Sequence, residues 1–256
     1  MQIRGKRALV TGAAGGLGTA ISEELASRGA SVVVSGRNRA GLETLAERIG
    51  GDVLVADLDD DADVARLAGA MPDVDLLIAN AGTGGDVPLE DLDTAQIDFS
   101  INVNLRAPIV LSTAFAQAHL AAGTPGHIVL IGSLSGIAAS PNTRMYNSTK
   151  FGLRGFGLSL RQDLHGTVVG CSVVEPGFIR EAGMFADSAI DLPPGVRTKG
   201  PGDVARAVAA AIEGDKGEVF VSPIELRLLS TLASVAPGFS ATVQRKLGVA
   251  ERKGGH

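Results

Sequence analysis

Residues 11–18 read TGAAGGLG and follow directly on a short apolar run, RALV at residues 7–10. Glycines let backbone amides come close to a pyrophosphate, and the N-terminus of the helix behind them favours anionic charge. The order Gly12, Gly16, Gly18 differs from the G-x-G-x-x-G fingerprint of dinucleotide-binding turns. A plain strand-to-helix turn would also explain the cluster. Its place after the first strand of a strand–helix–strand unit favours a dinucleotide site.

Six further apolar runs follow, separated by segments of helical period. They read SVVVSG, VLVAD, VDLLIANAG, HIVLIGS, VVGCSVVEPG and GEVFVSP, at residues 31–36, 53–57, 74–82, 127–133, 168–177 and 217–223. Continuous apolar strands are typical of a parallel sheet that is buried on both faces. The pattern predicts a doubly wound α/β fold of Rossmann type, with a seven-stranded parallel sheet flanked by helices.

Length and composition limit the other possibilities. A chain of 256 residues suits one α/β domain, so we expect a single dinucleotide-binding catalytic domain over residues 1–256, with residues 223–256 as a C-terminal helical extension. The net charge of −5 and the scattered basic residues argue against nucleic acid and favour a small-molecule partner.

Cysteine usage and the chain start bear on location. Cys171 is the only cysteine, so neither an intrachain disulfide nor a thiolate metal cluster can form, and no metal is expected. The opening MQIRGKRALV has no apolar export segment. No later run approaches the roughly 20 apolar residues that span a bilayer. We expect a cytoplasmic protein without an integral membrane segment.

The end of the second apolar run indicates which dinucleotide is bound. An acidic side chain there would pair with a ribose 2′-hydroxyl and repel a 2′-phosphate, but the turn contains no carboxylate and offers Arg37, whose guanidinium suits phosphate. NADP(H) is therefore preferred, with NAD(H) as the alternative; a solvated turn arginine would need no ligand. Asp57, beside Leu58, could accept from the adenine amino group or simply cap the next helix.

Tyr146 is the only tyrosine of the chain, and Lys150 follows four residues later. Side chains at i and i+4 share one face of a helix. A nearby ammonium favours the phenolate and lowers the pKa of a tyrosine by about one to three units, which makes the phenol a usable acid and base. Chance produces Y-x-x-x-K on exposed helices, but Ser133 ends the fifth apolar run at the same predicted edge as the glycine turn.

These motifs occur together in the order of a known family. Over about residues 6–222, the sequence resembles the short-chain dehydrogenase/reductase family, in its common single-domain branch. The matching positions are Gly12, Gly16, Gly18, Asn80, Ala81, Gly82, Asn104, Ser133, Tyr146, Lys150, Pro176 and Gly177.

The resemblance implies an oxidoreductase that moves a hydride between a nicotinamide cofactor and a carbonyl or secondary alcohol. Tyr146 would pass the proton, Ser133 would hold the substrate oxygen, and Lys150 would bind the nicotinamide ribose and lower the tyrosine pKa. Asn104 would hold a water that links Lys150 to solvent. A homodimer or homotetramer is also implied. The expected cofactor contacts are the family glycines with Leu17, Asn80, Ala81, Gly82, Tyr146, Lys150, Pro176, Gly177 and Ile179.

Asn104 has independent support from the sequence. Its carbonyl would accept from the amide of residue 108 in an α-helix, but Pro108 has no N–H. We expect a kinked helix and a water at that oxygen. Asn102 is expected to be structural.

The segment after Pro176-Gly177 departs from the family pattern. Glu181 stands where a Thr or Ser commonly meets the nicotinamide carboxamide. It could accept from the carboxamide, or face solvent while the backbone of Ile179 and Arg180 holds the ring.

Apolar residues near the predicted site favour a lipophilic substrate, although they could equally anchor loops. The candidate substrate contacts are Ser133, Leu134, Tyr146, Phe178 and Met184.

The C-terminal extension carries leucines on one helical face, at residues 228, 229 and 232. We expect this face to pack against its own domain or a second subunit. Shallow membrane binding is the alternative, because Arg245 and Lys246 accompany the apolar residues.

Two other classes of protein, a serine hydrolase and a dinucleotide sensor, share parts of this pattern. A serine hydrolase would need a G-x-S-x-G elbow, but Leu134 lies midway between Gly132 and Gly136. A dinucleotide sensor without chemistry has no need for Ser133, Tyr146 and Lys150 together.

Overall fold

A single parallel sheet organises the protein, with its strands in the order β3-β2-β1-β4-β5-β6-β7. The structure, a computed structural model, describes residues 1–84, 86–180 and 198–246. The predicted seven-stranded doubly wound sheet is confirmed. Its strands are β1 (Arg7–Thr11), β2 (Ser31–Gly36), β3 (Asp52–Val55), β4 (Leu76–Ala79), β5 (Gly126–Ile131), β6 (Val169–Pro176) and β7 (Glu218–Val221).

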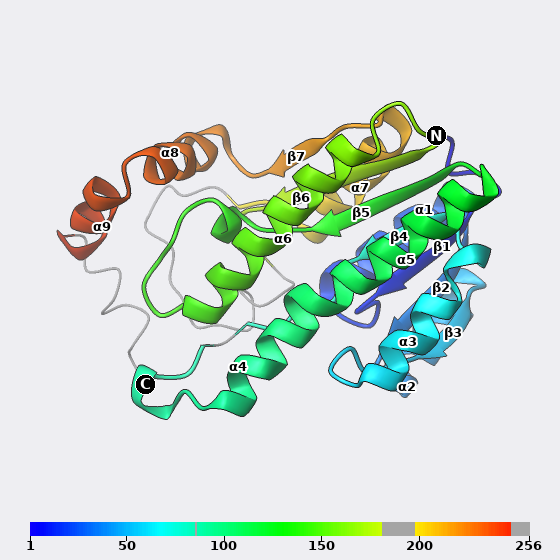
Figure 1. Cartoon of the computed structure of the whole chain (residues 1–256), viewed down its shortest axis with the longest axis horizontal. Coiled ribbons are helices and arrows are strands. Elements are labelled where there is room, and N and C mark those ends of the chain that lie inside the picture. The colour runs from blue at the N-terminus through cyan, green and yellow to red at the C-terminus, as the bar shows by residue number, and fades with distance from the viewer. Residues whose placement is uncertain (85, 181–197, 247–256) are drawn as a thin grey trace.

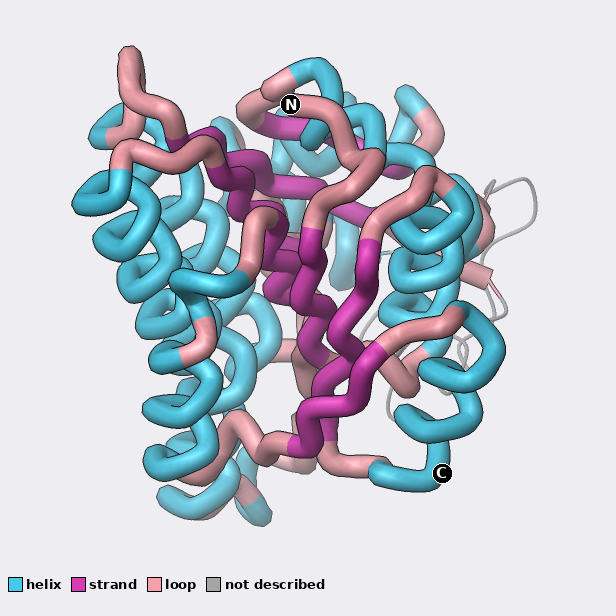
Figure 2. The backbone as a smooth tube through the Cα atoms, turned by 90° about the vertical axis from the view of Figure 1, so that its right-hand side faces the viewer, coloured by secondary structure: helices cyan, strands magenta, loops and turns pink. Residues whose placement is uncertain are grey.

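Helices cover both faces of the sheet, as Figure 2 shows. One core packs β1 and β2 against α1 (Gly16–Ser27), α2 (Arg39–Ile49) and α7 (Pro201–Gly214). The other lies under α3 (Asp61–Gly69), α5 (Ala107–Ala122) and α6 (Arg144–Asp163). Every residue of β4 and β5 is buried, as continuous apolar strands require when both faces are covered.

The strand order reverses at β1, which lies between β2 and β4. In open α/β sheets a ligand crevice forms outside the carboxyl ends of the strands at such a switch point. The glycine turn follows β1, and the Asn80-Ala81-Gly82 segment follows β4. Both segments therefore meet at this crevice, with the ends of β5 and β6 beside them (Figure 1).

The helix before α5 is irregular. Between α4 (Thr94–Ile101) and α5 the chain forms a π-helical turn, Asn102–Arg106, in which the Ala107 amide donates to the Asn102 carbonyl five residues back. Such turns are associated with functional sites and with helix kinks. The interruption expected before Pro108 is therefore present, whereas the kink and the water at the Asn104 carbonyl stay predictions.

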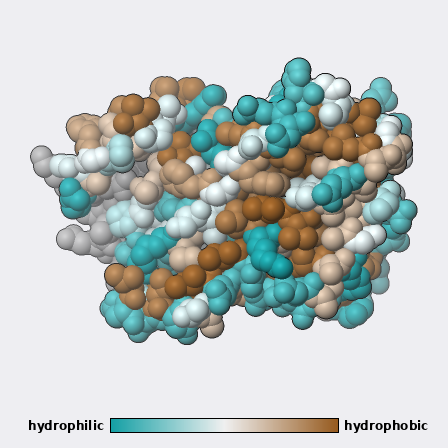
Figure 3. Space-filling model, viewed as in Figure 1, coloured by the Kyte–Doolittle hydropathy of each residue, from teal (hydrophilic) through white to brown (hydrophobic). Residues whose placement is uncertain are grey.

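Two helices, α8 (Ile224–Val235) and α9 (Pro237–Lys246), follow β7 at the left of Figure 1. Leu228, Leu229 and Leu232 of α8 are 50–63% exposed, and hydrophobic atoms cover this part of the surface in Figure 3. Of the two packing partners expected for these leucines, the described part of their own domain leaves them exposed, and packing against a second subunit stays a prediction. Throughout residues 1–84, 86–180 and 198–246, every helix is too short or too polar to cross a membrane.

Candidate active site

The glycine turn is shaped by close backbone approach. Gly12 has a φ of +63°, and a Cβ there would lie 2.7 Å from the Ala81 Cα. A Cβ on Gly18 would collide with the Gly12 carbonyl oxygen. The Thr11 hydroxyl accepts from the Asn80 and Ala81 amides, each at 3.1 Å. The Asn80 side-chain amide donates in return to the carbonyls of Thr11 (2.9 Å) and Gly12 (3.2 Å). Asn80 thus braces the turn.

This turn fits the pyrophosphate of a dinucleotide. Helix α1 begins at Gly16 with no side-chain cap on Gly15 and no acidic residue in its first turn. Its first amides, including those of Leu17 and Gly18, are therefore available to an anion. Only glycine fits at positions 12 and 18, because a Cβ there would collide with neighbouring backbone atoms. The turn is therefore free of side chains that would block an anion.

Arg37 and Asp57 lie together just beyond the carboxyl ends of β2 and β3. The Arg37 guanidinium is exposed and lies 3.9 Å from the Asp57 carboxylate and 5.7 Å from the centre of the Phe99 ring. Asp57 does not cap α3; its carboxylate accepts from the Asp59 amide (3.0 Å), and Asp60 is the cap. Leu58 is buried beside it. Both Arg37 and Asp57 thus keep polar atoms at the surface of the crevice.

Ser133, Tyr146 and Lys150 are brought together at the carboxyl end of β5. Ser133 follows β5 in extended conformation, and its hydroxyl accepts from the Ser135 amide at 3.1 Å. The Ser133 side chain lies close enough to the Tyr146 phenol to lower its pKa. The Lys150 ammonium is buried, donates to the Ile131 carbonyl at 2.8 Å, and lies 5.7 Å from the centre of the Tyr146 ring.

The acidity of Tyr146 differs from the prediction. Burial raises the pKa of the phenol to about 12, and the Ser133 hydrogen bond lowers it only in part. The ring keeps some exposure while its hydroxyl is withdrawn from water. Burial also lowers the pKa of Lys150 to about 8. The predicted lowering of the tyrosine pKa by the ammonium is therefore wrong: Lys150 is not among the groups that act on this pKa, and burial raises it.

Asn104 lies in the π-helical turn and faces the same site. Its side chain accepts from the Thr83 amide (2.7 Å) and donates to the Thr83 carbonyl (2.8 Å). A Cβ on Gly82 would lie 3.3 Å from the Asn104 oxygen and 3.7 Å from the Lys150 nitrogen. Asn104 and Lys150 therefore border Gly82 together. Asn102 donates to Asp59 at 2.9 Å, which agrees with its expected structural role.

The segment after β6 closes the other side of the crevice. The Gly177 amide donates to the Val221 carbonyl at 3.0 Å, and a Cβ on Gly177 would crowd Ser222. Ile179 is buried and pairs with Lys199, whereas Phe178 is 36% exposed. Glu181 and Met184 lie outside the described residues.

Four residues of the site were missed by the sequence reasoning. Thr11 bridges β1 and β4, Asp86 accepts from the first amides of α6 at Met145 and Tyr146, and Asn147 holds the carbonyls of Ser135 and Ala138. The fourth is Glu175, which is fully buried at the end of β6 and accepts from the Ser133 amide. A carboxylate inside an apolar strand run was a visible signal for it.

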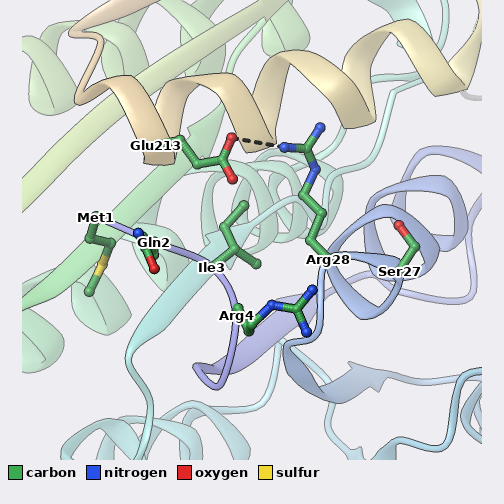
Figure 4. A pocket seen from close by; sticks show the side chains of 7 residues that line it. All are labelled: Met1, Gln2, Ile3, Arg4, Ser27, Arg28 and Glu213. Atoms are coloured by element: carbon green, nitrogen blue, oxygen red, sulfur yellow. Dashed lines mark hydrogen bonds and ion pairs between the residues drawn. The ribbon is translucent and has the colours of Figure 1, made fainter.

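A hollow at the opposite edge of the sheet is unrelated to this site. It is lined by Met1, Gln2, Ile3, Arg4, Ser27, Arg28 and Glu213. Figure 4 shows the Arg28–Glu213 ion pair across it. These residues precede β1 or end helices on the amino side of the sheet, so the hollow does not reach the glycine turn.

Comparisons with known proteins agree with this geometry. A family model described as short chain dehydrogenase matches residues 6–192. A ketoacyl reductase of Nostoc sp. is 30% identical over 97% of this chain and 91% of its own. A 3-oxoacyl-[acyl-carrier-protein] reductase of Escherichia coli is 32% identical over 82% of this chain and 90% of its own. A short-chain dehydrogenase of Sphingobium yanoikuyae, solved with NADPH, is 25% identical, has a TM-score of 0.76, and matches over 96% of this chain and 95% of its own.

The model match, the relatives and the shared fold lead to one assignment. The chain belongs to the short-chain dehydrogenase/reductase family and is an NAD(P)-dependent oxidoreductase that acts on CH–OH or C=O groups.

Proposed function

We propose that the protein transfers hydride between NADP(H) and a lipophilic ketone or secondary alcohol, with Tyr146 as proton donor and acceptor. One observation carries the proposal: the fold brings Ser133, Tyr146 and Lys150 together, with the Ser133 side chain acting on the Tyr146 phenol and the buried Lys150 ammonium 5.7 Å from the centre of the Tyr146 ring. They lie at the carboxyl edge of the sheet, where the glycine turn fits a dinucleotide.

The three side chains have distinct roles in this proposal. Ser133 and Tyr146 form a pair of hydroxyls that can bind one substrate oxygen, and Tyr146 gives that oxygen its proton during reduction. The raised pKa keeps the phenol protonated at neutral pH in the free protein, so it enters the reaction as an acid. The bound nicotinamide supplies or accepts the hydride. Lys150 holds the nicotinamide ribose, and Asn104 positions a water that relays protons to solvent.

In this proposal the dinucleotide is held by backbone and side-chain groups along the crevice. The amides at the start of α1 bind the pyrophosphate, and the adenine lies against Asp57 and Leu58. The nicotinamide end lies near the segment of Asn80, Ala81 and Gly82 and near Pro176, Gly177 and Ile179. Arg37 favours NADP(H), because its exposed guanidinium can pair with a 2′-phosphate. The neighbouring Asp57 moderates this preference by competing for the same cation.

The cofactor preference is tested by titrating NADPH and NADH into the wild type and Arg37→Ala. We expect NADPH to bind more tightly to the wild type, and the substitution to weaken NADPH by about tenfold, as the loss of one charge-assisted phosphate contact would. NADH affinity should stay within twofold. Arg39→Ala is the matched control, since Arg39 pairs with Glu43 on α2. Tighter NADH binding and no effect of Arg37→Ala would mean an NAD-preferring dehydrogenase.

The substrate class is inferred from the walls of the site. Leu134 follows Ser133 in the chain and lies near Gly177, and the exposed Phe178 follows Gly177. Two curated relatives are named for reduction of ketoacyl groups. Apolar walls with a few polar groups are typical of pockets for lipophilic ligands. We therefore expect kcat/KM to rise with the apolar chain length of the ketone.

The reaction is tested by following NADPH oxidation with ketones and 3-oxoacyl thioesters of increasing chain length. We expect turnover, and a loss of about 10²-fold in kcat for Ser133→Ala, which removes a hydrogen bond to the substrate oxygen. Ser135→Ala is the control; it keeps the amide that donates to Ser133. Cofactor binding without turnover across the panel would indicate a dinucleotide-sensing protein instead.

The proposal includes a cytoplasmic homodimer or homotetramer. The exposed leucines of α8 offer an apolar surface to a second subunit. Mass measurement in solution tests the number of subunits.

A further inference from the structure

Glu175 is a buried carboxylate that the proposed mechanism leaves without a role. Its side chain is fully buried at the end of β6. One oxygen, Oε2, accepts from the Ser133 amide at 2.5 Å. The other, Oε1, has no hydrogen-bond partner among the described residues. A half-satisfied buried carboxylate is expensive for the fold, so a purely structural origin is unfavourable.

The surroundings of Glu175 leave its charge only partly balanced. Arg154, one helical turn after Lys150 on α6, has its Nε 3.9 Å from Oε1. The same nitrogen donates to Glu218 of β7 at 2.7 Å, so Arg154 is committed to Glu218. Lys150 also acts on Glu175: its ammonium donates to the Ile131 carbonyl, directly before the Gly132 backbone against which the Glu175 carboxylate lies. Glu175 acts on Tyr146 through its charge.

The strand next to Glu175 makes room for it. A Cβ on Gly132 would collide with the Glu175 carboxylate. Gly132 directly precedes Ser133, so the carboxylate lies against the backbone that carries the Ser133 hydroxyl. Any larger residue at position 132 would displace the carboxylate from the Ser133 amide.

We propose that Glu175 is a positioning residue: its carboxylate fixes the Ser133 backbone through the amide N–H and supplies the negative charge that Lys150 and Tyr146 both face. The hydrogen bond keeps the Ser133 hydroxyl directed to the Tyr146 hydroxyl. The charge opposes ionisation of Tyr146, since a nearby anion disfavours the phenolate. The assignment rests on the proposed roles of Ser133 and Tyr146.

The groups that act on Glu175 come from three neighbouring elements. Ser133 lies after β5, Lys150 and Arg154 are on α6, and Glu218 is on β7. Burial raises the pKa of Glu175 to about 7, while the Ser133 amide, Lys150 and Arg154 lower it and Glu218 raises it. Glu175 therefore changes charge near neutral pH, where the enzyme would work.

The positioning role is tested with Glu175→Ala, Glu175→Asp and Glu175→Gln. Ala removes the acceptor and Asp withdraws it, so we expect both to lower kcat by about 10–100-fold, with NADPH affinity within threefold. Gln keeps an oxygen for the Ser133 amide and should stay within fivefold of the wild type. Glu218→Gln is the matched control, because Glu218 touches Arg154 but not Ser133. Unchanged kcat in Glu175→Ala and Glu175→Asp, or an equal loss in Glu218→Gln, would overturn the positioning role.

The charge is tested without any turnover, because Tyr146 is the only tyrosine. Protein labelled with ¹³Cζ-tyrosine gives one phenol resonance, which is followed from pH 7 to 11.5 with circular dichroism as the check on folding. We expect the resonance to move toward the phenolate at a pH about 0.5–1 unit lower in Glu175→Gln than in the wild type. Glu218→Gln should differ by less than half as much. Coinciding curves for wild type and Glu175→Gln would refute the charge role.

The two readouts separate this inference from the proposed function. Absence of turnover in the wild type would count against the proposed function, while the resonance would still report whether Glu175 acts on Tyr146. Turnover in the wild type with no effect at Glu175 would reject only the inference.

Discussion

Strands β5 and β6 bury a titratable side chain at each end, and the two ends are built differently. At the amino end, the buried His127 of β5 is bonded to the Ser172 hydroxyl of β6 at 2.8 Å. At the carboxyl end, Glu175 accepts from the Ser133 amide, while its other oxygen has only the Arg154 Nε at 3.9 Å and no hydrogen bond within the described part of the chain. The buried His127 ring thus has a hydrogen-bond partner, whereas one oxygen of the buried Glu175 has none among the residues that the structure describes.

The electrostatics of the two ends differ in the same sense. Burial lowers the pKa of His127 to about 4, so the ring is neutral at pH 7. Burial raises the pKa of Glu175 to about 7, so protonated and ionised forms of this carboxyl coexist at pH 7. A hydrogen-bonded neutral group rigidifies a fold, whereas a buried ionisable group with a strongly shifted pKa is typical of a functional site.

Unsatisfied polar atoms gather at the carboxyl end. Within the described residues, buried side-chain atoms without a partner are found on Ser112, Arg144, Glu175 and Ser222. Three of these lie next to the site: Arg144 starts α6, Glu175 ends β6 and Ser222 follows β7.

The comparison also weakens the hydrolase alternative. A serine hydrolase would need a histidine beside Ser133, but His127 lies at the other end of β5 and is occupied by Ser172. Its role in this fold is structural.

Lys150→Met should have the largest effect on activity among the substitutions at the carboxyl end of the sheet. We expect kcat to fall by about 10²–10³-fold, as for the loss of a single electrostatic group at a reacting centre. Stability should not fall at pH 7, because the Lys150 pKa is lowered from 10.5 to about 8, so the buried ammonium opposes folding below pH 8. Steady-state kinetics and thermal unfolding measure both. A large loss of stability with retained kcat would make Lys150 structural.

His127→Ala should lower the free energy of unfolding at the amino end of the sheet without changing kcat. The wild type should lose about 3 kcal/mol as the pH falls from 6.5 toward 4, because the unfolded histidine binds a proton that the folded one rejects. The variant should lack this component. At pH 7.5 it should be destabilised by about 1–3 kcal/mol, since Ser172 loses its partner, with kcat within twofold. Urea unfolding at pH 7.5 and pH 5 measures both, and an equal pH dependence in the two proteins would contradict the prediction.

Glu175→Gln should raise the free energy of unfolding at high pH, which tests whether the buried charge at the carboxyl end is costly. The folded pKa of Glu175 is raised from 4.5 to about 7, so the stability that protonation gives is complete below pH 4.5 and is lost as the pH rises through 7. The variant should therefore gain about 1–2 kcal/mol over the wild type at pH 8 and nothing near pH 4.5. Urea unfolding at the two pH values measures the difference. A variant that is less stable than the wild type at pH 8 would show that the charge is well paired.

The fold could be predicted from the sequence because its signals are local. Seven apolar runs and the glycine turn indicate a doubly wound parallel sheet with a ligand crevice at its carboxyl edge, through general rules for such sheets. Gly12 is a clear example, since its positive φ and its contact with Ala81 leave no room for a side chain.

The protonation of the site could not be predicted in the same way. The spacing of Tyr146 and Lys150 places them on one face of α6, but burial decides their pKa values, and burial depends on β5, β6 and the loop after Ser133 together. The α8 leucines show the same limit, since a helical stripe does not say whether its partner lies in the same chain. Glu175 was visible as a charge in a buried strand, yet only the fold shows that it meets Ser133.

Hydride transfer in Tyr146→Phe tests the central claim most directly. The substitution removes one hydroxyl and leaves the ring, and no other tyrosine is present. With NADPH saturating and a ketone that the wild type reduces, single-turnover loss of NADPH absorbance should be at least about 10³-fold slower, within the range expected for loss of a general acid. NADPH affinity should stay within threefold. A rate within tenfold of the wild type would show that Tyr146 is not the proton donor.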